Sequence, residues 1–294
     1  MTVLKQGQSA DIGLLLEGTY PYVSGGVSSW VNQIIKGFPE YTFALCFIGS
    51  QPSDYGDMRY ALPDNVVHLE VHYLHEPQSK PPVIKRKGNA QVFKEIRCLH
   101  DQYRHADSPK TETASLLASI MKHRHEGRYA EADFLYSRES WDYITEQYRE
   151  RCTDPSFVDY FWTVRIMHSP LWKLMALTES FIPVKVFHTI STGYAGFLGA
   201  LMKQRTGKPL ILSEHGIYTK ERKIDLFQAE WIRDNRGTLA KDSSEVAYFR
   251  HLWIRFFEAL GRDCYHHADR IIALYETNRL RQIQDGAPAE RTEN

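Results

Sequence analysis

The sequence predicts an α/β protein built on a Rossmann-like open parallel sheet with a helical insertion. Three observations predict this class. Short apolar runs alternate with helical spacing towards both ends of the chain, and a glycine-rich loop and a helix follow the first run at once. The middle of the chain, about residues 88–180, has helical spacing and no good strand candidate. We therefore expect residues 1–294 to form one domain with the insertion inside it.

The first strand is expected at Asp11–Glu17, where the run DIGLLLE suits a strand buried on both faces. The run stops at Gly18, and the loop GTYPYVSGG begins there. A helix is expected next, because apolar residues recur on one face at Val27, Trp30, Val31, Ile34 and Ile35. Two more apolar runs predict strands at Thr42–Ile48 and Val66–Leu74.

The central segment, about residues 88–180, is charged and aromatic. Its apolar spacing predicts helices around Phe93–Leu99, Leu116–Met121 and Ala132–Arg149. Asp154-Pro155 predicts a helix start, since Asp suits the N-cap and Pro suits the first helical position. We interpret the segment as a helical insertion between strands and not as a separate domain.

The alternation of strands and helices then resumes. Apolar runs predict three more strands, at Val184–Thr189, Pro209–Glu214 and Arg270–Leu274. Helical spacing predicts four helices, at Gly193–Arg205, Phe227–Asn235, Ser243–His267 and Glu276–Gln284. Small residues in the first of these helices allow close packing on a sheet.

The composition excludes several classes of protein. The 36 Lys+Arg residues balance 36 Asp+Glu, and a neutral chain lacks the basic excess of a general nucleic-acid binder. The longest apolar runs, such as Ile12–Leu16, are too short to span a membrane, and the polar start MTVLKQGQSAD does not resemble a signal peptide. A cytoplasmic globular protein is expected.

Cysteine and histidine give no metal or disulfide signature. The four cysteines are far apart in the sequence and form no CxxC pair, so we interpret them as reduced thiols. The histidines at 68, 72 and 75, at 123 and 125, and at 266 and 267 lack metal-ligand spacing. They are interpreted as packing or solvated side chains, and no metal site is expected.

Gly25-Gly26 is the first candidate site. The pair lies between the first strand and the first helix, where exposed backbone N–H groups at a helix N-terminus face a bound phosphate in many proteins. The loop matches neither GxGxxG nor a P-loop, so an ordinary turn is the alternative.

His188 and His215 form the second candidate. Each falls at the carboxyl end of a predicted parallel strand, where open α/β sheets bind ligands. An imidazole there is suited to bonding a sugar hydroxyl or a phosphate. The alternative is that each ring ties down a loop.

Tyr218–Lys223 is the third candidate, because it places Lys220, Arg222 and Lys223 just after a predicted strand. These cations are suited to an anionic group. A solvated charged face is the alternative.

Three stretches of the chain resemble known glycosyltransferases. LLLEGTYPYVSGGVSSWV and FHTISTGYAGFLGALMKQRTGKPLILSEHGIYTKER resemble the PelF-like family of bacterial Pel exopolysaccharide synthesis. ADRIIALYETNRLRQIQDGAPAERT is similar to the segment before the interdomain crossover of glycogen-synthase-like retaining transferases. The resemblance spans nearly the whole chain and implies the N-terminal, acceptor-side half of a GT-B fold.

The resemblance also implies roles for single residues. Tyr20-Pro21 matches the pair that opens the family's glycine loop, and Gly25 and Gly26 match glycines whose backbone approaches the donor diphosphate. His215 matches a histidine near the transferred sugar. His215 is therefore the candidate catalytic residue, and the candidate binding residues are Tyr20, Gly25, Gly26, Val27, His188 and Arg222.

The implied reaction is retaining, metal-independent sugar transfer to a glycan acceptor, with a UDP-sugar such as UDP-glucose as donor and no cofactor. The implied partners are Pel synthase components at the inner membrane, which would hold the protein there peripherally. The implied C-terminal donor domain, with its IPNG-like turn and paired glutamates, is missing from this sequence. This chain is therefore expected to fold alone, to leave Tyr20 and Tyr22 exposed, and to transfer no sugar by itself.

Two other functions stay open. One is a non-catalytic docking module of a membrane polysaccharide synthase, which would bind through the helical insertion. The other is a GT-B-like sugar-nucleotide epimerase. The second is disfavoured, because such enzymes use carboxylates in the interdomain cleft, whereas the predicted strand ends offer histidines.

Overall fold

The computed structural model describes residues 2–75, 86–104, 110–152, 156–228 and 248–294. The chain divides into two compact units. The sheet unit consists of Met1–Pro77, Lys173–Thr219 and Leu260–Asn294, and the helical unit of Gln78–Trp172 and Lys220–Ala259.

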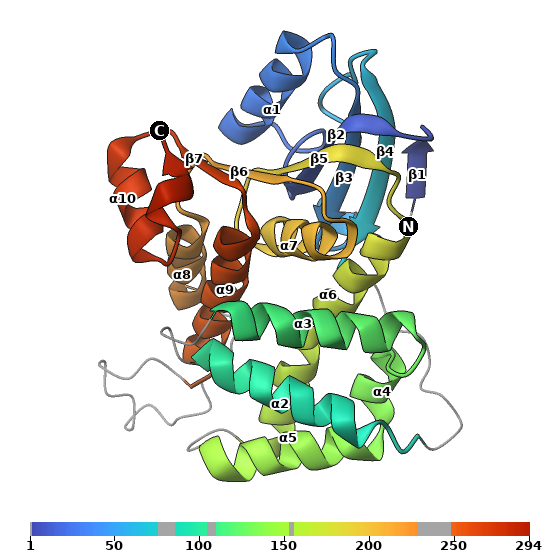
Figure 1. Ribbon diagram of the computed structural model, residues 1–294, viewed down its shortest axis with the longest axis vertical. Helices are drawn as coiled ribbons and strands as arrows, with labels where there is room; N and C mark the ends of the chain where they lie inside the picture. Colours follow the sequence, from blue (N-terminus) through green and yellow to red (C-terminus); the bar gives the residue numbers. More distant parts are fainter. Residues whose placement is uncertain (1, 76–85, 105–109, 153–155, 229–247) are drawn as a thin grey trace. The chain divides into compact units, whose positions relative to one another are not determined.

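The sheet unit contains one eight-stranded sheet with the order β1-β4-β3-β2-β5-β6-β7-β8 (Figure 1). Strands β2 to β8 pair in parallel, and β1 pairs with β4 antiparallel. The order β4-β3-β2-β5-β6-β7 is that of the Rossmann fold, so the predicted fold class is confirmed. The strands are β1 Thr2–Lys5, β2 Ala10–Glu17, β3 Phe43–Gly49, β4 Val66–Tyr73, β5 Val184–Thr189, β6 Leu210–Glu214, β7 Arg270–Ala273 and β8 Thr292–Glu293.

The described helices fall in both units. Three of them lie in the sheet unit alone: α1 Gly26–Gly37, α7 Tyr194–Thr206 and α10 Glu276–Gln284. Four lie in the helical unit alone: α2 Ala90–Arg104, α3 Lys110–His125, α4 Glu131–Tyr136 and α5 Arg138–Arg151. Three continue from one unit into the other: α6 Phe157–Ser180, α8 Tyr218–Gln228 and α9 Tyr248–His267. None of the helices in the described ranges is both long enough and apolar enough to cross a membrane.

Strands β2 and β5 lie side by side at the centre of the sheet. Leu14 pairs with His188 and Leu15 with Thr189, so both strands end at the same edge. The chain leaves β2 towards β3 and leaves β5 towards β6, in opposite directions. This is the topological switch point, where open α/β sheets bind ligands.

Alternation along β2 explains why helices cover both faces of the sheet. Leu14 and Leu16 pack in one cluster with Val31 of α1. Leu15, one position out of phase, lies on the face of α7, and a Cβ built on Gly199 of that helix would be 3.4 Å from the Leu15 side chain. The ribbon shows α1 and α7 on opposite sides of the strands (Figure 1).

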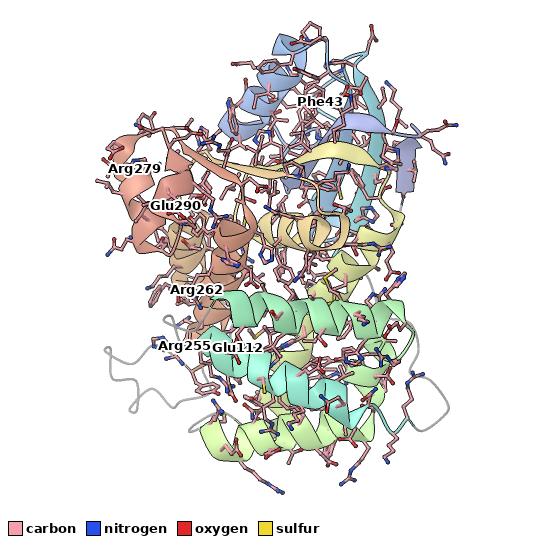
Figure 2. All side chains as sticks on the ribbon, viewed as in Figure 1. Phe43, Glu112, Arg255, Arg262, Arg279 and Glu290 are labelled. Carbon is pink, nitrogen blue, oxygen red and sulfur yellow. The ribbon has the colours of Figure 1, made fainter. Side chains whose placement is uncertain are left out.

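Strand β3 shows why an unbroken apolar run predicts a strand so well. All its residues from Phe43 to Gly49 are buried. Phe43, which begins the strand, is labelled in Figure 2. Because helices cover both faces of the parallel sheet, no position of the strand needs a polar side chain.

The helical unit has an aromatic core. The rings of Phe93 and Phe134 stack 6.3 Å apart, and Tyr129 packs edge-on against Trp172 at 4.7 Å. The only bridge that the described residues of this unit form is an isolated one between Arg86 and Ser137. The predicted helical character is therefore confirmed, and its interpretation as an insertion inside one domain stays a prediction.

Several element boundaries differ from the prediction. The expected helix Ala132–Arg149 is two helices, because Ser137 ends α4 and caps α5 by accepting a hydrogen bond from the Ser140 N–H at 3.1 Å. Strands β1 and β8 were not predicted, since β1 is a largely exposed edge strand and β8 has two residues. Three predicted features lie wholly or partly outside the described residues: the Asp154-Pro155 cap, the start of Ser243–His267 and most of Phe227–Asn235, of which the first two residues end α8.

Candidate functional site

Glu17, the last residue of β2, lies at the switch point. Its Oε2 accepts a hydrogen bond from the backbone N–H of Ala195 at 3.2 Å, in the first turn of α7. Its Oε1 accepts one from the Tyr218 hydroxyl at 2.8 Å. The N-terminus of a helix carries a partial positive charge, so the carboxylate caps α7 as a bound anion would.

Gly193, the N-cap residue of α7, makes this arrangement possible. A Cβ at this position would lie 2.3 Å from Cζ of Tyr218 and 2.6 Å from Oε2 of Glu17. No other residue fits there without moving both side chains. The start of α7 is thus closed by groups of the chain itself.

Glu214, the last residue of β6, caps α8 in the same way. It is 1% exposed, and four donors surround its carboxylate: Thr192 Oγ1 at 3.1 Å, the Tyr218 N–H at 3.3 Å, the Tyr265 hydroxyl at 2.7 Å and Gln282 Nε2 at 2.9 Å. Burial raises the pKa of Glu214, and the hydrogen bonds oppose that effect. The network fixes the strand end and the loop after it.

The start of α1 is open by contrast. Its N-cap, Gly25, provides no side-chain cap, and its first turn contains no acidic residue. Gly25 and Gly26 are exposed, and a Cβ on Gly25 would have nothing within 4 Å. Three other helices each have a carboxylate at the N-terminus: Glu17 at α7, Glu214 at α8 and Glu276 at α10.

His215 lies next to this open end. A Cβ built on Gly26 would be 3.9 Å from Nε2 of His215, and the ring centroids of His215 and Trp30 are 6.4 Å apart. The side chain is exposed. The structure thus brings together the glycine pair and the histidine that the sequence singled out separately.

His188 is engaged within the sheet instead. Its Nε2 lies 2.9 Å from the Ser213 hydroxyl on β6. Burial lowers the pKa of His188 to about 4, so the ring is neutral near pH 7. These contacts favour the structural alternative for His188 and distinguish it from the exposed His215.

Tyr20 is part of the hydrophobic core, so the expectation that it is exposed is wrong. The side chain is 0% exposed, and its ring lies 5.2 Å from that of Tyr60. Tyr22 is half-buried, 4.7 Å from the ring of Phe47. The Tyr-Pro loop folds back onto β3, and Val27 packs against the same core.

Arg222 lies on α8, in the part that belongs to the helical unit. Its guanidinium stacks over the Phe257 ring at 4.6 Å, and its Nε is buried without a hydrogen-bond partner. Tyr218, from the same polar run, donates to Glu17. The first and fifth residues of the run thus have different surroundings.

The sequence model described as "Domain of unknown function (DUF3492)" matches residues 10–290. The chain belongs to the DUF3492 family. The match begins at the first residue of β2 and includes α1, the switch point and the helical unit. The comparison with curated proteins gives no match.

Sequence reasoning missed the two carboxylates that organise the site of this DUF3492 chain. Glu17 and Glu214 are the last residues of their strands, and that position was the signal available. Two strands thus end in carboxylates, and the expectation that the strand ends offer histidines instead is wrong. Both carboxylates are hydrogen-bonded as helix caps, and that distinguishes them from the open α1 end.

The first histidine cluster packs inside the same sheet. Glu70 lies between His68 and His72 on one face of β4, with oxygens 2.9 and 2.8 Å from their Nε2 atoms. Burial alone would raise the pKa of Glu70, but the hydrogen bonds from His72 and His68 outweigh it and lower the pKa.

All four cysteines are free thiols. Within the described ranges, no group of three or more His, Cys, Asp or Glu side chains is arranged to hold a metal ion.

Proposed function

We propose that this chain is the acceptor-side domain of a retaining glycosyltransferase, and that the diphosphate of a UDP-sugar binds at the start of α1. The observation that carries the proposal is the contrast at the switch point. The start of α7 is filled by Glu17, whereas the start of α1 presents Gly25, Gly26 and His215 to solvent. The open end has the partial positive charge and free space that a phosphate group requires.

The chemistry follows from these groups. In a retaining transfer, negative charge develops on the departing UDP while positive charge develops on the sugar ring. The N–H groups of the first turn of α1 stabilise the first charge, and a hydrogen bond from His215 orients the sugar. The proposal includes no metal and no cofactor. The full enzyme would use UDP-glucose as its donor and lengthen a glycan in Pel exopolysaccharide synthesis, in the cytoplasm beside inner-membrane partners.

A charge introduced at Gly26 tests the site. Gly26→Asp gives α1 the first-turn carboxylate that α10 already has, so it should preserve or raise the free energy of unfolding. The same carboxylate repels a diphosphate, so isothermal titration with UDP and UDP-glucose should show binding to wild type and none to Gly26→Asp. Gly26→Asn is the matched neutral control and should retain most of the binding. Equal UDP affinity in all three proteins would refute the site.

His215→Ala tests the catalytic assignment in the full-length enzyme. Loss of one preorganised contact costs about 3 kcal/mol in the barrier, about a hundredfold in turnover. Because His215 is exposed, the melting temperature of the His215→Ala variant should hardly differ from that of wild type. Near-normal turnover would show that His215 has no catalytic role.

The same titrations separate the alternatives. A pure docking module binds neither UDP nor UDP-sugars. An epimerase would convert a UDP-sugar without an acceptor and would depend on Glu17 or Glu214. Acceptor-independent conversion that Glu17→Gln abolishes would favour the epimerase over the transferase.

A further inference from the structure

Helix α6 has an exposed apolar ridge in the helical unit. Val158, Trp162 and Ile166 are four residues apart, and they are 61%, 53% and 48% exposed. Residues between them, such as Tyr160 and Val164, are buried, so this part of the helix is apolar on both faces. A helix of this kind is normally covered on both sides.

Trp162 is held in place by its neighbours. Its ring packs edge-on against Phe161 at 5.6 Å, and the Arg165 guanidinium lies 5.5 Å from its centroid. Arg165 is 6% exposed, donates to the Leu135 carbonyl and also stacks on the rings of Tyr136 and Phe161. A preordered aromatic side chain loses little conformational entropy on binding, which is the property of an interface anchor.

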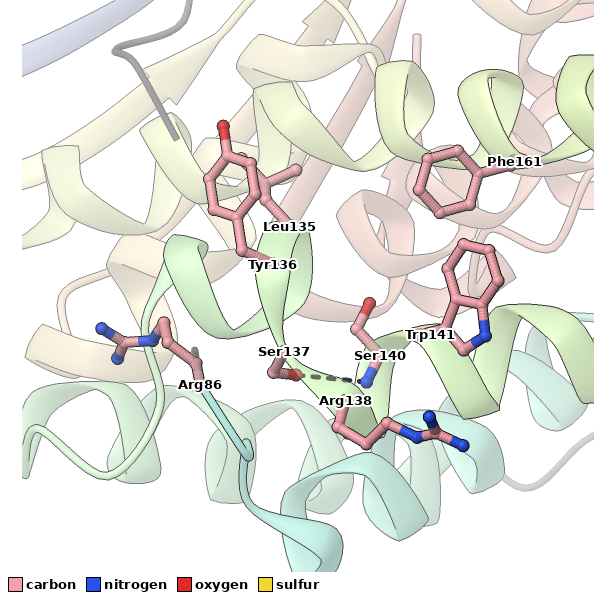
Figure 3. Close-up of a pocket in the computed structure, with 8 residues that line it drawn as sticks. All are labelled: Arg86, Leu135, Tyr136, Ser137, Arg138, Ser140, Trp141 and Phe161. Carbon is pink, nitrogen blue, oxygen red and sulfur yellow. Dashed lines mark hydrogen bonds between the residues drawn. The ribbon is translucent and has the colours of Figure 1, made fainter. Parts of the chain in front are cut away.

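A pocket of about 280 Å³ adjoins this ridge, because Phe161, the residue before Trp162 on α6, is one of its lining residues (Figure 3). Leu135, Tyr136, Trp141 and Phe161 form its apolar wall, and Arg86 and Arg138 extend away from each other at its sides. Its volume is at the lower limit of the range of about 300–1,000 Å³ that small-molecule sites occupy. Since the pocket is also open to solvent, its size suits one large side chain of a protein partner.

The composition of this surface favours a second copy of the same chain. A projecting aromatic residue and a pocket lie next to each other, which is the self-complementary arrangement that a twofold interface needs. Both charge signs occur on α5 next to Trp141, where Arg138 pairs with Asp142 at 2.9 Å. A bilayer surface would instead select a basic excess, and the neutral net charge of the chain lets two copies approach without repulsion.

We propose that two copies of this chain pair through the α5–α6 surface, defined as Trp141, Val158, Trp162, Ile166 and the adjoining pocket. The Trp162 ring of each copy enters the pocket of the other. This pairing is independent of the proposed sugar transfer, since it uses residues of the helical unit only.

Sedimentation equilibrium over a range of protein concentrations tests the proposal. The wild-type chain should show a reversible monomer–dimer equilibrium. Trp162→Ser and, separately, Trp141→Ser should each raise the dissociation constant at least about thirtyfold, the effect of losing an interface hot spot. The matched control is Leu280→Ser on α10, which removes an apolar side chain that is 55% exposed in the sheet unit and should leave the constant unchanged.

Urea unfolding of each variant shows whether it is folded. If Trp162→Ser does not fold, Val158→Ser and Ile166→Ser are measured in its place, because Val158 and Ile166 are exposed and lie on the same ridge. A wild-type chain that stays monomeric at every concentration would overturn the proposal. So would a dimer that the ridge and pocket variants leave unchanged, or a monomer that binds vesicles of phosphatidylglycerol through Trp162.

Discussion

Helices α1 and α7 begin at the same edge of one sheet. The N-cap residue of each helix is a glycine, which has no side chain to cap the helix itself. The two glycines serve opposite purposes. Gly193 leaves room for a carboxylate and a tyrosine ring, whereas nothing lies within 4 Å of a Cβ on Gly25. A glycine at a strand–helix junction is therefore no evidence of a ligand site until the groups around it are known.

The comparison also shows which end of the switch point the chain completes by itself. Glu17 directly precedes the loop to α1, yet it caps α7, because β2 lies beside β5 and both end at the same edge. The chain thus satisfies one positive helix end with its own carboxylate. The other end, the start of α1, has no acidic residue in its first turn.

The largest expected effect comes from adding one methyl group at Gly193, the N-cap of α7. Gly193→Ala forces Tyr218 and Glu17 apart, so that the hydrogen bonds of the half-buried Glu17 carboxylate with the Ala195 N–H and the Tyr218 hydroxyl break. We expect a loss of about 3 kcal/mol in the free energy of unfolding. Gly25→Ala is the matched control, since its Cβ points into open space, and it should change stability by less than about 1 kcal/mol. Both are measured by urea unfolding, and equal losses would contradict the contrast.

His188 extends the comparison to pH. His188 is neutral in the folded chain, where burial lowers its pKa to about 4, and its ordinary pKa of 6.5 applies when the chain unfolds. The unfolded state binds the additional proton, so stability is full above pH 6.5 and falls as the pH drops towards 4. The loss reaches up to about 3 kcal/mol at the acid end.

His188→Gln isolates this contribution, because glutamine also bonds to a hydroxyl and does not titrate. Its free energy of unfolding should fall less steeply between pH 6.5 and 4 than that of wild type. Identical slopes for wild type and His188→Gln would show that His188 is not buried in its neutral form.

Glu17→Ala removes the carboxylate at the start of α7. It removes the cap of α7 and the acceptor of the Tyr218 hydroxyl, and we expect a loss of about 1–2 kcal/mol. The uncapped helix should then bind an added anion, so phosphate should restore part of the lost stability. Wild type in the same phosphate concentrations is the control. A variant that gains no more from phosphate than wild type does would show that the start of α7 is not an anion position.

Local patterns predicted the parts of the fold that local patterns determine. The apolar runs at β2, β3 and β5 and the helical spacing of α1 carry enough information within a few residues to identify each element. The break at Ser137 was missed because apolar spacing continues across it, and a cap depends on one hydroxyl. Edge strand β1 was missed because an exposed strand needs no apolar run.

The site was predicted in part for a related reason. Gly25, Gly26 and His215 follow strand ends, so topology alone places them at one edge. The role of Glu17 depends on Ala195 and Tyr218, which are far away in the sequence and meet it only in the folded sheet. Tyr20 was expected on the surface because the resemblance implies a missing donor domain, whereas in the fold its ring packs near Tyr60, another distant residue.

The smallest expected effect concerns Tyr20, at the beginning of the loop to α1. Its hydroxyl is buried without a hydrogen-bond partner, and burial raises its pKa to about 12. Because an unpaired buried hydroxyl costs free energy, Tyr20→Phe should leave stability unchanged or raise it by up to about 1 kcal/mol. The ring itself fills the core, so Tyr20→Ala is the control and should cost about 3–5 kcal/mol.

Urea unfolding measures the stability of both variants, and UDP titration of Tyr20→Phe shows whether the hydroxyl also contributes to binding at the start of α1. Unchanged UDP affinity would make Tyr20 a core residue only, and a loss of stability above 1 kcal/mol in Tyr20→Phe would mean that the hydroxyl is bonded in the folded chain.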